Sequence, residues 1–246
     1  MTNGSSPTLE QQRSYYDGLW VDVGAAELNN HERSRFAQIA AALSKLPPKG
    51  PASHRILEVG CGRGWLSGLV LSHRGDVRAL DLSPESIEKA SAAFPNVEFE
   101  VRDILTSPPP DRYDLIVSSE VIEHVPDQRR FVDVLLDSLA PGGYLLLTTP
   151  NARLRPRWDR RSDFRPQPIE QWLDPQQLQA LVARRCELIE RTTFFFDVGR
   201  GWPYSLINSR VGRTIRRRWG GQAGPIDRLV GRLGHGLYAI VLGRVR

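Results

Sequence analysis

The sequence predicts a doubly wound α/β fold, in which helices cover both faces of a mainly parallel β-sheet. Three observations lead to this prediction. Short apolar runs alternate with helical segments, a glycine-rich turn follows the first of these runs, and polar side chains stand where several runs end. Alternating strands and helices are typical of parallel sheets with right-handed crossovers. Ligands of such sheets bind beyond the carboxyl ends of the strands.

The predicted elements follow one another in a regular order. Apolar residues recur at helical spacing over 31–46, which predicts an amphipathic helix that Pro47 and Pro48 end. Ser83 suits the N-cap of a later helix. Strands are predicted at 55–59, 76–80, 97–101, 114–118 and 144–148, and helices at 65–72, 84–94 and 128–140, with a turn at 141–143. The order is completed by a helix at 175–185, strands at 187–196 and 237–245, and a basic insertion at about 199–235 with two short helical stretches.

Length and composition bound the class of protein. The 246 residues, with 40% hydrophobic and 25% charged side chains, suit one globular domain over 1–246. Residues 1–10 lack the pattern of a signal peptide, and no apolar run approaches the ~18 residues of a membrane span. Cys61 and Cys186 fit neither a disulfide framework nor a metal motif. We therefore expect a cytoplasmic protein.

Charge is divided unevenly along the chain. Residues 1–150 hold 14 Lys and Arg against 20 Asp and Glu, whereas residues 151–246 hold 19 Arg against 8 Asp and Glu. The net charge therefore changes from −6 to +11 between the two parts. The second part is expected to meet an anionic or flat partner. The alternative is a solvated surface that uses Arg in place of Lys, since the chain has only three Lys.

The glycine-rich turn lies between a buried strand and a helix. Its glycines, Gly60, Gly62 and Gly64, leave room for a ligand and allow positive φ. Their spacing differs from the Gly-x-Gly-x-x-Gly of dinucleotide-binding turns, which hold a pyrophosphate. Glu58, two residues before the turn, suits a cationic aminoacyl sulfonium and would repel a phosphate. Asp81, 21 residues after Gly60, stands where a carboxylate accepts two hydrogen bonds from a ribose diol.

Further polar residues end the next two strands. Asp103 follows the third strand, where it could accept a hydrogen bond from an adenine amino group, with Ile104 beside the ring. Ser119 and Glu120 follow the fourth strand. Each of these residues alone has an ordinary explanation as a polar strand end. Their occurrence at the ends of four successive strands, counting the turn and Asp81, predicts a nucleoside site.

Four motifs in order resemble those of the class I S-adenosylmethionine-dependent methyltransferases. They are Ile56-Leu-Glu-Val-Gly-Cys-Gly-Arg-Gly64, Ala79-Leu-Asp-Leu-Ser83, the run from Tyr113 to Asp127, and Leu139-Ala-Pro-Gly-Gly-Tyr144. The resemblance covers residues 31–150, the expected cofactor-binding core, and is to the ubiquinone-biosynthesis O-methyltransferase type and related bacterial small-molecule methyltransferases. It implies a Rossmann-like doubly wound sheet of seven strands, in the order 3-2-1-4-5-7-6 with the last strand antiparallel.

The resemblance also implies a set of cofactor contacts. Arg35 stands where that family has a cofactor-contacting Arg, although an Arg on the surface of a helix is an equally good account of it. Tyr15, Tyr16 and Trp20 are expected to close over the cofactor, or else to pack against the first predicted helix. The expected S-adenosylmethionine-binding residues are Arg35, Glu58, Gly60, Cys61, Gly62, Gly64, Asp81, Leu82, Asp103, Ile104, Ser119 and Glu120.

The expected catalytic residues are His124 and its neighbour Glu123. Transfer of a methyl group from a sulfonium depends mainly on placing the nucleophile behind the methyl group. For a hydroxyl acceptor, a general base adds about 10²–10⁴-fold, and an imidazole has a suitable pKa. His124 follows the fourth strand and is expected to face the cleft. The alternative is that His124 holds a loop through a backbone hydrogen bond.

Metal binding is a further possibility at the same position. Glu120, Glu123 and His124 together could hold a divalent cation such as Mg²⁺, and the resembling ubiquinone-type enzymes are linked to Mg²⁺ through this group. The same three residues look like the metal ligands of small-RNA 2′-O-methyltransferases. That family uses a further His after the fifth strand, and residues 151–172 contain no His. The RNA interpretation is weakened accordingly.

The acceptor is expected to meet two basic segments, 151–175 and 199–235. The first contains Arg153, Arg155, Arg157, Arg160, Arg161 and Arg165 around Trp158, and the second contains Arg210, Arg213, Arg216, Arg217 and Arg218 beside Trp219. Such loops suit an anionic acceptor, nucleic acid, a peripheral membrane surface or a solvated lid. We expect methyl transfer to a hydroxyl of a small molecule: a phenol, a quinone precursor or a sugar. An RNA methyltransferase and a non-catalytic cofactor-binding partner subunit are the alternatives, and the sequence indicates no oligomeric state.

Overall fold

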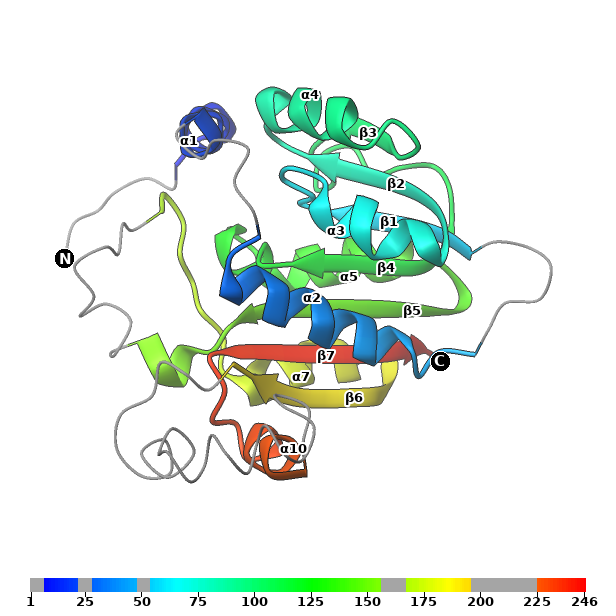
Figure 1. Cartoon of the computed structure of the whole chain (residues 1–246), viewed down its shortest axis with the longest axis vertical. Helices are drawn as coiled ribbons and strands as arrows, with labels where there is room; N and C mark the ends of the chain where they lie inside the picture. The colour runs from blue at the N-terminus through cyan, green and yellow to red at the C-terminus, as the bar shows by residue number, and fades with distance from the viewer. Residues whose placement is uncertain (1–6, 22–27, 48–53, 156–166, 196–224) are drawn as a thin grey trace.

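The fold is a seven-stranded sheet with helices on both faces (Figure 1). The computed structural model describes residues 7–21, 28–47, 54–155, 167–195 and 225–246. The strands are β1 (His54–Val59), β2 (Gly75–Asp81), β3 (Glu98–Val101), β4 (Tyr113–Ser119), β5 (Leu139–Pro150), β6 (Cys186–Phe194) and β7 (Tyr238–Val245). The helices are α1 (Leu9–Val21), α2 (Asn30–Leu43), α3 (Trp65–Leu69), α4 (Pro84–Ala93), α5 (Gln128–Asp137), α7 (Pro175–Ala183) and α10 (Pro225–Arg232), with 3₁₀ turns η1 (Leu71–His73), η2 (Ile122–His124) and η3 (Ala152–Leu154).

The strand order is β3-β2-β1-β4-β5-β7-β6. The pairs from β3 to β5 are all parallel. The last strand, β7, inserts between β5 and β6 and is antiparallel to both. The predicted order and the predicted direction of the last strand are therefore confirmed.

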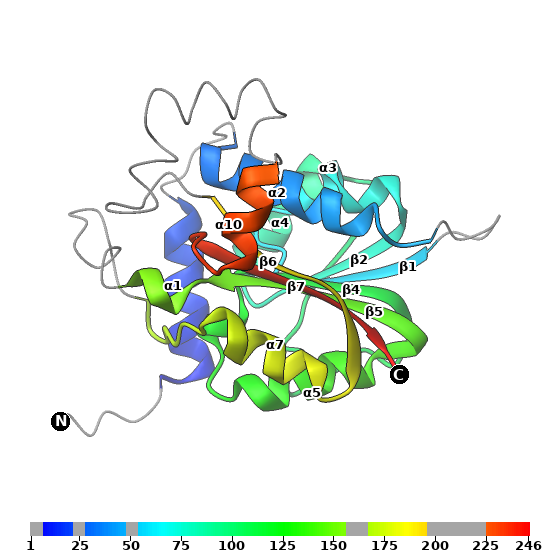
Figure 2. The same ribbon diagram turned by 90° about the horizontal axis from the view of Figure 1, so that it is seen from below.

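The helices form one layer on each face of the sheet. Seen along the plane of the sheet, α2, α3 and α10 lie on one side, and α5 and α7 lie on the other (Figure 2). Each side has its own apolar core. Leu43 of α2 and Leu66 of α3 pack into one buried cluster, whereas Phe131 of α5 and Leu178 of α7 pack into the other. The inner strands β1, β4, β5 and β7 contribute buried residues to both clusters, as continuous apolar runs require.

Side-chain caps fix where several helices begin. Asn29 and Glu32 form a capping box at the start of α2, and Asp174 and Gln177 form another at α7. Ser83 accepts a hydrogen bond from the backbone N–H of Ser86, so the predicted cap of α4 is confirmed. These caps matter for the site because they fix where α2 and α4 begin. The segments next to these helix starts reach the carboxyl ends of the strands.

The remaining differences from the predicted elements have local causes. Helix α2 ends at Leu43 instead of residue 46, since Ser44 already serves as its C-cap. The predicted helix at 65–72 is divided into α3 and η1. Helix α1 was not predicted from the sequence. Of the two helical stretches expected in the 199–235 insertion, α10 is present, and residues 196–224 lie outside the described part of the chain.

The predicted turn at 141–143 is wrong, because these residues lie inside β5. Tyr113 pairs with Leu139 and Leu115 pairs with Tyr144, so β5 carries three extra residues opposite β4. Gly142 has a φ of +71°, which a glycine adopts without strain. The Pro-Gly-Gly signal therefore marks a bulge within a strand, one of the positions where glycine is expected in sheets.

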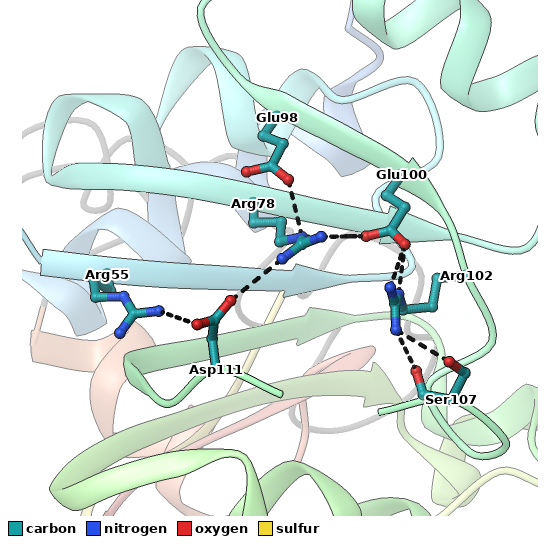
Figure 3. A network of polar contacts seen from close by, with 7 residues as sticks. All are labelled: Arg55, Arg78, Glu98, Glu100, Arg102, Ser107 and Asp111. Atoms are coloured by element: carbon teal, nitrogen blue, oxygen red, sulfur yellow. Dashed lines mark hydrogen bonds and ion pairs between the residues drawn. The ribbon is translucent and has the colours of Figure 1, made fainter. Parts of the chain in front are cut away.

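A network of ion pairs joins the edge strand β3 to β2 (Figure 3). Arg78 of β2 lies 3.2 Å from a carboxylate oxygen of Glu98 and 2.7 Å from one of Glu100. The same guanidinium lies 3.4 Å from Asp111, and Arg102 lies 2.6 Å from Glu100. Charged side chains on an edge strand oppose pairing with a strand of another molecule.

Among the described residues, no helix has the length and apolar character needed to cross a membrane.

Candidate active site at the carboxyl ends of the strands

A cavity of about 610 Å³ opens at the carboxyl ends of the parallel strands. Its wall is built from the residues that end β1, β2 and β4, together with parts of α1, α2, η2, β7 and the segment 167–172. The predicted cofactor residues in this wall are Arg35, Glu58, Gly60, Cys61, Gly62, Asp81, Leu82, Ser119 and Glu120. Both predicted catalytic residues, Glu123 and His124, line the same cavity.

The glycine-rich turn requires its glycines. Gly60, Gly62 and Gly64 have φ values of +77°, +51° and +74°, a region that L side chains rarely adopt. A Cβ on Gly60 would lie 2.2 Å from Cγ2 of Val121, and one on Gly64 would lie 2.6 Å from Cζ of Phe99. Gly60 and Gly62 form part of the cavity wall. Gly64 is absent from that wall, and its lack of a side chain permits close packing of the turn against Phe99.

Asp81 holds the glycine-rich turn and faces the cavity. Its carboxylate accepts hydrogen bonds from the backbone N–H of Gly62 at 2.7 Å and of Ser83 at 3.0 Å. Burial raises the pKa of Asp81, and these backbone hydrogen bonds act in the opposite direction. The cap of α4 is Ser83, so Asp81 is not needed for that task. A partly buried carboxylate at this strand end is available to a ligand.

Glu58 is a second buried carboxyl group in the wall. The hydroxyl of Ser67 donates a hydrogen bond to its Oε2. Burial raises the pKa of Glu58 to about 8, although the bond from Ser67 lowers it. A group with this pKa holds a proton at neutral pH until a cation approaches it. The site therefore suits a ligand with a positive charge next to Glu58.

Arg35 reaches the cavity from α2. Its Nη1 lies 3.9 Å from Oε2 of Glu120, and its guanidinium carbon lies 6.0 Å from the centroid of the Tyr238 ring. The side chain is only 18% exposed, which disfavours the interpretation as an ordinary surface Arg. Its buried Nε finds no hydrogen-bond partner among the described residues. A buried donor without a partner is unfavourable, so the wall offers a binding position for an anionic group.

Ser119 and Glu120 are held by a chain of hydroxyl groups. The Ser119 and Thr148 hydroxyls lie 2.8 Å apart, and Thr148 donates to Oε1 of Glu120 at 2.9 Å. Glu120 has a φ of +60°, a strained conformation for a residue with a side chain. Burial and the neighbouring Glu123 carboxylate raise the pKa of Glu120 to about 8. Such strain is typical of functional sites.

One of the two ring nitrogens of His124 carries no proton. Its Nδ1 lies 2.8 Å from the backbone oxygen of Ile169. A carbonyl oxygen can only accept, so Nδ1 carries the proton and Nε2 is an acceptor. Nε2 lies 3.6 Å from Oε1 of Glu123, whose other oxygen accepts from Thr149 at 2.8 Å. The loop-holding bond expected as an alternative role is thus present, and it leaves Nε2 suited to take a proton.

The pKa shifts around His124 favour a neutral imidazole. Burial lowers the pKa of His124, although the bond to Ile169 and the Glu170 carboxylate raise it. Burial raises the pKa of Glu123 to about 7. The desolvation that removes charge from the imidazole therefore also favours protons on the adjacent carboxyl groups.

The predicted Mg²⁺ ligands do not fit a three-donor metal site. Among the residues that the structure describes, no three His, Cys, Asp or Glu side chains are grouped so that they could hold a metal ion. Each of the three side chains has one polar atom engaged elsewhere: Oε1 of Glu120 by Thr148, Oε2 of Glu123 by Thr149, and Nδ1 of His124 by a backbone oxygen. We therefore assign no step of the chemistry to a metal.

Asp103 and Ile104 are not brought to the cavity wall. The Asp103 carboxylate accepts hydrogen bonds from the backbone N–H of Leu105 at 2.9 Å and from the Thr106 hydroxyl at 3.0 Å. Ile104 is buried in an apolar cluster. Asp103 thus forms a local turn of its own, as Asp often does after a strand.

Several residues of the wall were not predicted from the sequence. Gln167, Glu170 and Trp172 come from the segment after β5, and Tyr238 begins β7. They stand in no motif, and only the strand order indicates that these segments reach the cavity. Tyr15 and Tyr16, expected either to close over the cofactor or to pack against the first predicted helix, also line the cavity. The side chain of Trp20 lies outside the described residues.

Only a small part of the Arg-rich segments can be placed. Nη1 of Arg155 donates to the backbone oxygen of Glu170 at 2.8 Å, and Arg153 donates to Gln176. The remaining basic and aromatic residues predicted to meet the acceptor lie outside the described residues. They are Arg157, Trp158, Arg160, Arg161, Arg165, Arg210, Arg213, Arg216, Arg217, Arg218 and Trp219.

Comparisons with known proteins agree with this fold. The chain is 32% identical over 128 residues to a ubiquinone biosynthesis O-methyltransferase of Psychrobacter arcticus, a match that covers 49% of this chain and 50% of the relative. It is 28% identical over 207 residues to a probable chloroplastic tocopherol O-methyltransferase of Oryza sativa subsp. japonica, covering 76% of this chain and 54% of the relative. The chain thus spans about half the length of the curated relatives it matches.

A solved structure shares the fold. The N-methyltransferase NodS of Bradyrhizobium japonicum, in complex with S-adenosylhomocysteine, superposes with a TM-score of 0.60 over 96% of each chain, at 19% identity.

A family model described as a methyltransferase domain matches residues 31–211. That match covers most of the chain and includes the glycine-rich turn, Asp81 and His124. The chain therefore belongs to the methyltransferase domain family and has the Rossmann-like fold of the S-adenosylmethionine-dependent methyltransferases.

Proposed function

We propose that the chain transfers a methyl group from S-adenosylmethionine to a hydroxyl group of a small molecule. The observation that carries the proposal is that Asp81 and His124 face one cavity, with the bare Nε2 of His124 available as a base. Its volume, about 610 Å³, is within the range of small-molecule sites. We further propose that residues 1–246 act as one domain, with 31–150 as the cofactor-binding core and 151–175 and 199–235 on the acceptor side.

Three charged groups are proposed to hold the cofactor. Asp81 accepts hydrogen bonds from the ribose hydroxyls, as carboxylates at this strand end do in doubly wound folds. Glu58 pairs with the ammonium group, whose approach lowers the pKa of the buried carboxyl and ionises it. Arg35 pairs with the carboxylate and so satisfies its buried Nε. The methyl group on a sulfonium is already activated for displacement.

The remaining work of the protein is to place the acceptor and to accept its proton. Holding the acceptor oxygen in line behind the methyl carbon supplies roughly 7–11 kcal/mol of the barrier reduction. Nε2 of His124 takes the hydroxyl proton while the oxygen bonds to the methyl carbon, and the electrons of the broken carbon–sulfur bond stay on sulfur. The hydrogen bond between Nδ1 and Ile169 supports the protonated imidazole. The curated relatives that match the chain are named as O-methyltransferases of ubiquinone biosynthesis and of tocopherol, which favours a small molecule over RNA as the acceptor.

Cofactor binding tests this proposal directly. The wild-type protein is expected to bind S-adenosylhomocysteine, and not NAD, in a calorimetric titration. Asp81→Asn is expected to weaken that binding by about 10–150-fold, the size of a charge-assisted hydrogen bond of roughly 1.5–3 kcal/mol.

A matched control separates this effect from general damage. Glu88 is an exposed carboxyl residue of α4 outside the cavity, and Glu88→Gln is expected to leave affinity unchanged. Circular dichroism checks that Asp81→Asn still folds, since Asp81 also holds Gly62. Equal affinity of wild type and Asp81→Asn would contradict the ribose contact, and preference for NAD would contradict the cofactor.

A further inference from the structure

The segment 167–172, which we call the acceptor arm, is fastened to the turn that carries the base. The backbone oxygen of Ile169 accepts from His124 at 2.8 Å, and the backbone N–H of Gln171 donates to the backbone oxygen of Glu123 at 2.8 Å. Gln128 of α5 donates to the backbone oxygen of Gln171 at 2.7 Å. Three hydrogen bonds thus fix the acceptor arm beside η2. Any side chain that the arm points into the cavity therefore starts from a backbone that is fixed relative to His124.

Glu170 is such a side chain, and its carboxylate is held from several directions. Nε1 of Trp172 donates to Oε1 of Glu170 at 2.9 Å, and the backbone N–H of Gln167 lies 3.4 Å from Oε2. The guanidinium of Arg155 lies 5.3 Å from the centroid of the Trp172 ring and donates to the backbone oxygen of Glu170. Gln167, Glu170 and Trp172 all line the cavity. The arrangement presents one oriented carboxylate with remaining acceptor capacity.

The hydrogen bonds of the arm to His124 and Glu123 place Glu170 at the end of the cavity where the base lies, and the electrostatic influence of Glu170 on its neighbours agrees with this placement. Burial raises the pKa of Tyr16, and Glu123 and Glu170 are among the charges that raise it further. Glu170 also raises the pKa of His124 against the effect of burial. Tyr16 and His124 are close, with ring centroids 6.2 Å apart. The carboxylate of Glu170 therefore acts on the space next to Nε2, where the acceptor must lie.

Carboxyl side chains outnumber guanidinium groups in the described wall of the cavity. This wall contains six acidic residues and two Arg, which are Glu32, Glu58, Asp81, Glu120, Glu123, Glu170, Arg35 and Arg63. An anionic group on the acceptor would be repelled by Glu170 in a poorly solvated space, where charges interact strongly. It would also raise the already elevated pKa values of the neighbouring carboxyl groups. A cationic or hydrogen-bond-donating group meets neither penalty.

We propose that Glu170 selects the acceptor, accepting a hydrogen bond from a hydroxyl or ammonium group that the acceptor carries in addition to the hydroxyl that is methylated. Acceptors with a carboxylate or phosphate at that position are rejected. This inference rests on the proposed methyl transfer and names the acceptor class for it. Glu170 is a specificity-determining residue, and Trp172 and Gln167 position it.

Four matched phenols test this selection. Tyramine carries an ammonium group, tyrosol a hydroxyl, 4-propylphenol an apolar end and 3-(4-hydroxyphenyl)propanoate a carboxylate, each at the end of a similar chain opposite the phenol. With radiolabelled S-adenosylmethionine, kcat/KM of the wild type is expected to be highest for tyramine and tyrosol and lowest for the propanoate. The span is expected to be about tenfold or more, as for a hydrogen bond to a charged group.

Removing the charge should change the order of the probes. Glu170→Gln is expected to lower kcat/KM for tyramine by about tenfold and to raise it for the propanoate, with S-adenosylhomocysteine affinity unchanged. Glu187→Gln, an exposed carboxyl residue of β6 outside the cavity, serves as the control and should keep the wild-type order. An ammonium-only preference would identify a cationic acceptor, and equal use of tyrosol would identify an uncharged donor; both support the proposal.

The proposal is overturned if the wild type prefers the propanoate or if Glu170→Gln keeps the wild-type order. It is also overturned if a protein that binds S-adenosylhomocysteine neither methylates nor binds any of the four phenols. That last result leaves the cofactor site intact. Failure to bind S-adenosylhomocysteine at all is the distinct outcome that contradicts the proposed function itself.

Discussion

At the scale of single residues, desolvation determines which groups in the cavity hold a proton. Burial raises the pKa of Glu58 and of Glu120 to about 8 and that of Glu123 to about 7, while it lowers the pKa of His124. Near neutral pH the carboxyl groups thus tend to hold protons and the imidazole does not. Pairs of titratable groups whose environments separate their pKa values are typical of acid and base assignments. His124 is the residue of this set that is ready to accept a proton.

His124→Ala is therefore expected to lower kcat by about 10²–10⁴-fold with an uncharged hydroxyl acceptor such as tyrosol, because the general base is lost. Affinity for S-adenosylhomocysteine should stay within about twofold of the wild type, since His124 is not among the groups proposed to hold the cofactor. Because the pKa of His124 is lowered, wild-type activity should persist to a lower pH than an ordinary imidazole would allow. Radiometric assays across pH and calorimetry measure these quantities.

The control for this variant is His73→Ala. His73 is exposed in η1 and lies outside the cavity wall, so its removal should not change kcat. Unchanged kcat in His124→Ala would show that another group accepts the proton. A parallel loss of cofactor affinity would instead assign His124 a binding role.

At the scale of elements, the glycine-rich turn and the β5 bulge each contain a glycine with a positive φ. The two positions show that φ alone does not determine how strongly a side chain would be disfavoured there. Gly60 has a φ of +77° and Gly142 a φ of +71°. A Cβ on Gly60 would lie 2.2 Å from the Cγ2 methyl carbon of Val121 in the cavity wall, whereas one on Gly142 would lie 3.3 Å from the flexible end of Arg244. The backbone strain is similar at the two positions, and only Gly60 adds a clash.

Gly60→Ala and Gly142→Ala form a matched pair for this reason. Each is expected to lose about 1 kcal/mol or more of unfolding free energy from the unfavourable φ, and Gly60→Ala about 1–3 kcal/mol more from overpacking. Only Gly60→Ala should also weaken S-adenosylhomocysteine binding, since its turn lines the cavity. Urea denaturation and calorimetry report the two effects. Equal losses of unfolding free energy in both variants, together with equal affinity for S-adenosylhomocysteine, would mean that a clash with Val121 affects neither stability nor cofactor binding.

The elements predicted well are those whose signals are local. Apolar runs bounded by caps gave β1, β2, β4 and α4 nearly to the residue, because a cap such as Ser83 uses neighbours within one turn of chain. Helix α1 was missed because its fixing contacts come from afar: the Ser83 hydroxyl donates to Asp17 at 2.5 Å. The bulge in β5 was missed because Pro-Gly-Gly gives the same signal in a turn.

The candidate site divides in the same way. Motif residues such as Asp81 and His124 could be found from the sequence, since each follows a recognisable strand. Asp103 satisfied the same criterion, yet its carboxylate accepts hydrogen bonds from Leu105 and Thr106, which no strand-end pattern reveals. Glu170 and Tyr238 could not be found, because they reach the cavity only through the strand order and the docking of a loop.

At the scale of the whole molecule, the buried carboxyl groups link stability to pH. Glu58 has a pKa of about 8 in the folded protein and an ordinary one near 4.3 when unfolded. The folded state therefore binds more protons between these values, so its stability is fully present below the unfolded pKa and is lost as pH rises through the folded pKa. Glu120 and Glu123 act in the same direction. The unliganded protein is thus expected to melt at a lower temperature at pH 8 than at pH 6.

The expected fall is at least about 2–4 °C, the shift that ~1 kcal/mol produces in a protein of this size. Glu58→Gln, which cannot ionise, should reduce it, and Glu88→Gln on the exposed face of α4 should not. Saturating S-adenosylhomocysteine should reduce it as well, because the ammonium group proposed to lie at Glu58 stabilises the ionised carboxylate. Scanning calorimetry at both pH values measures all four conditions. If the melting temperature of Glu58→Gln depends on pH as that of the wild type does, with and without ligand, Glu58 is not the partner of the ammonium group. The carboxylate that pairs with the ammonium group would then be Glu120 or Glu123.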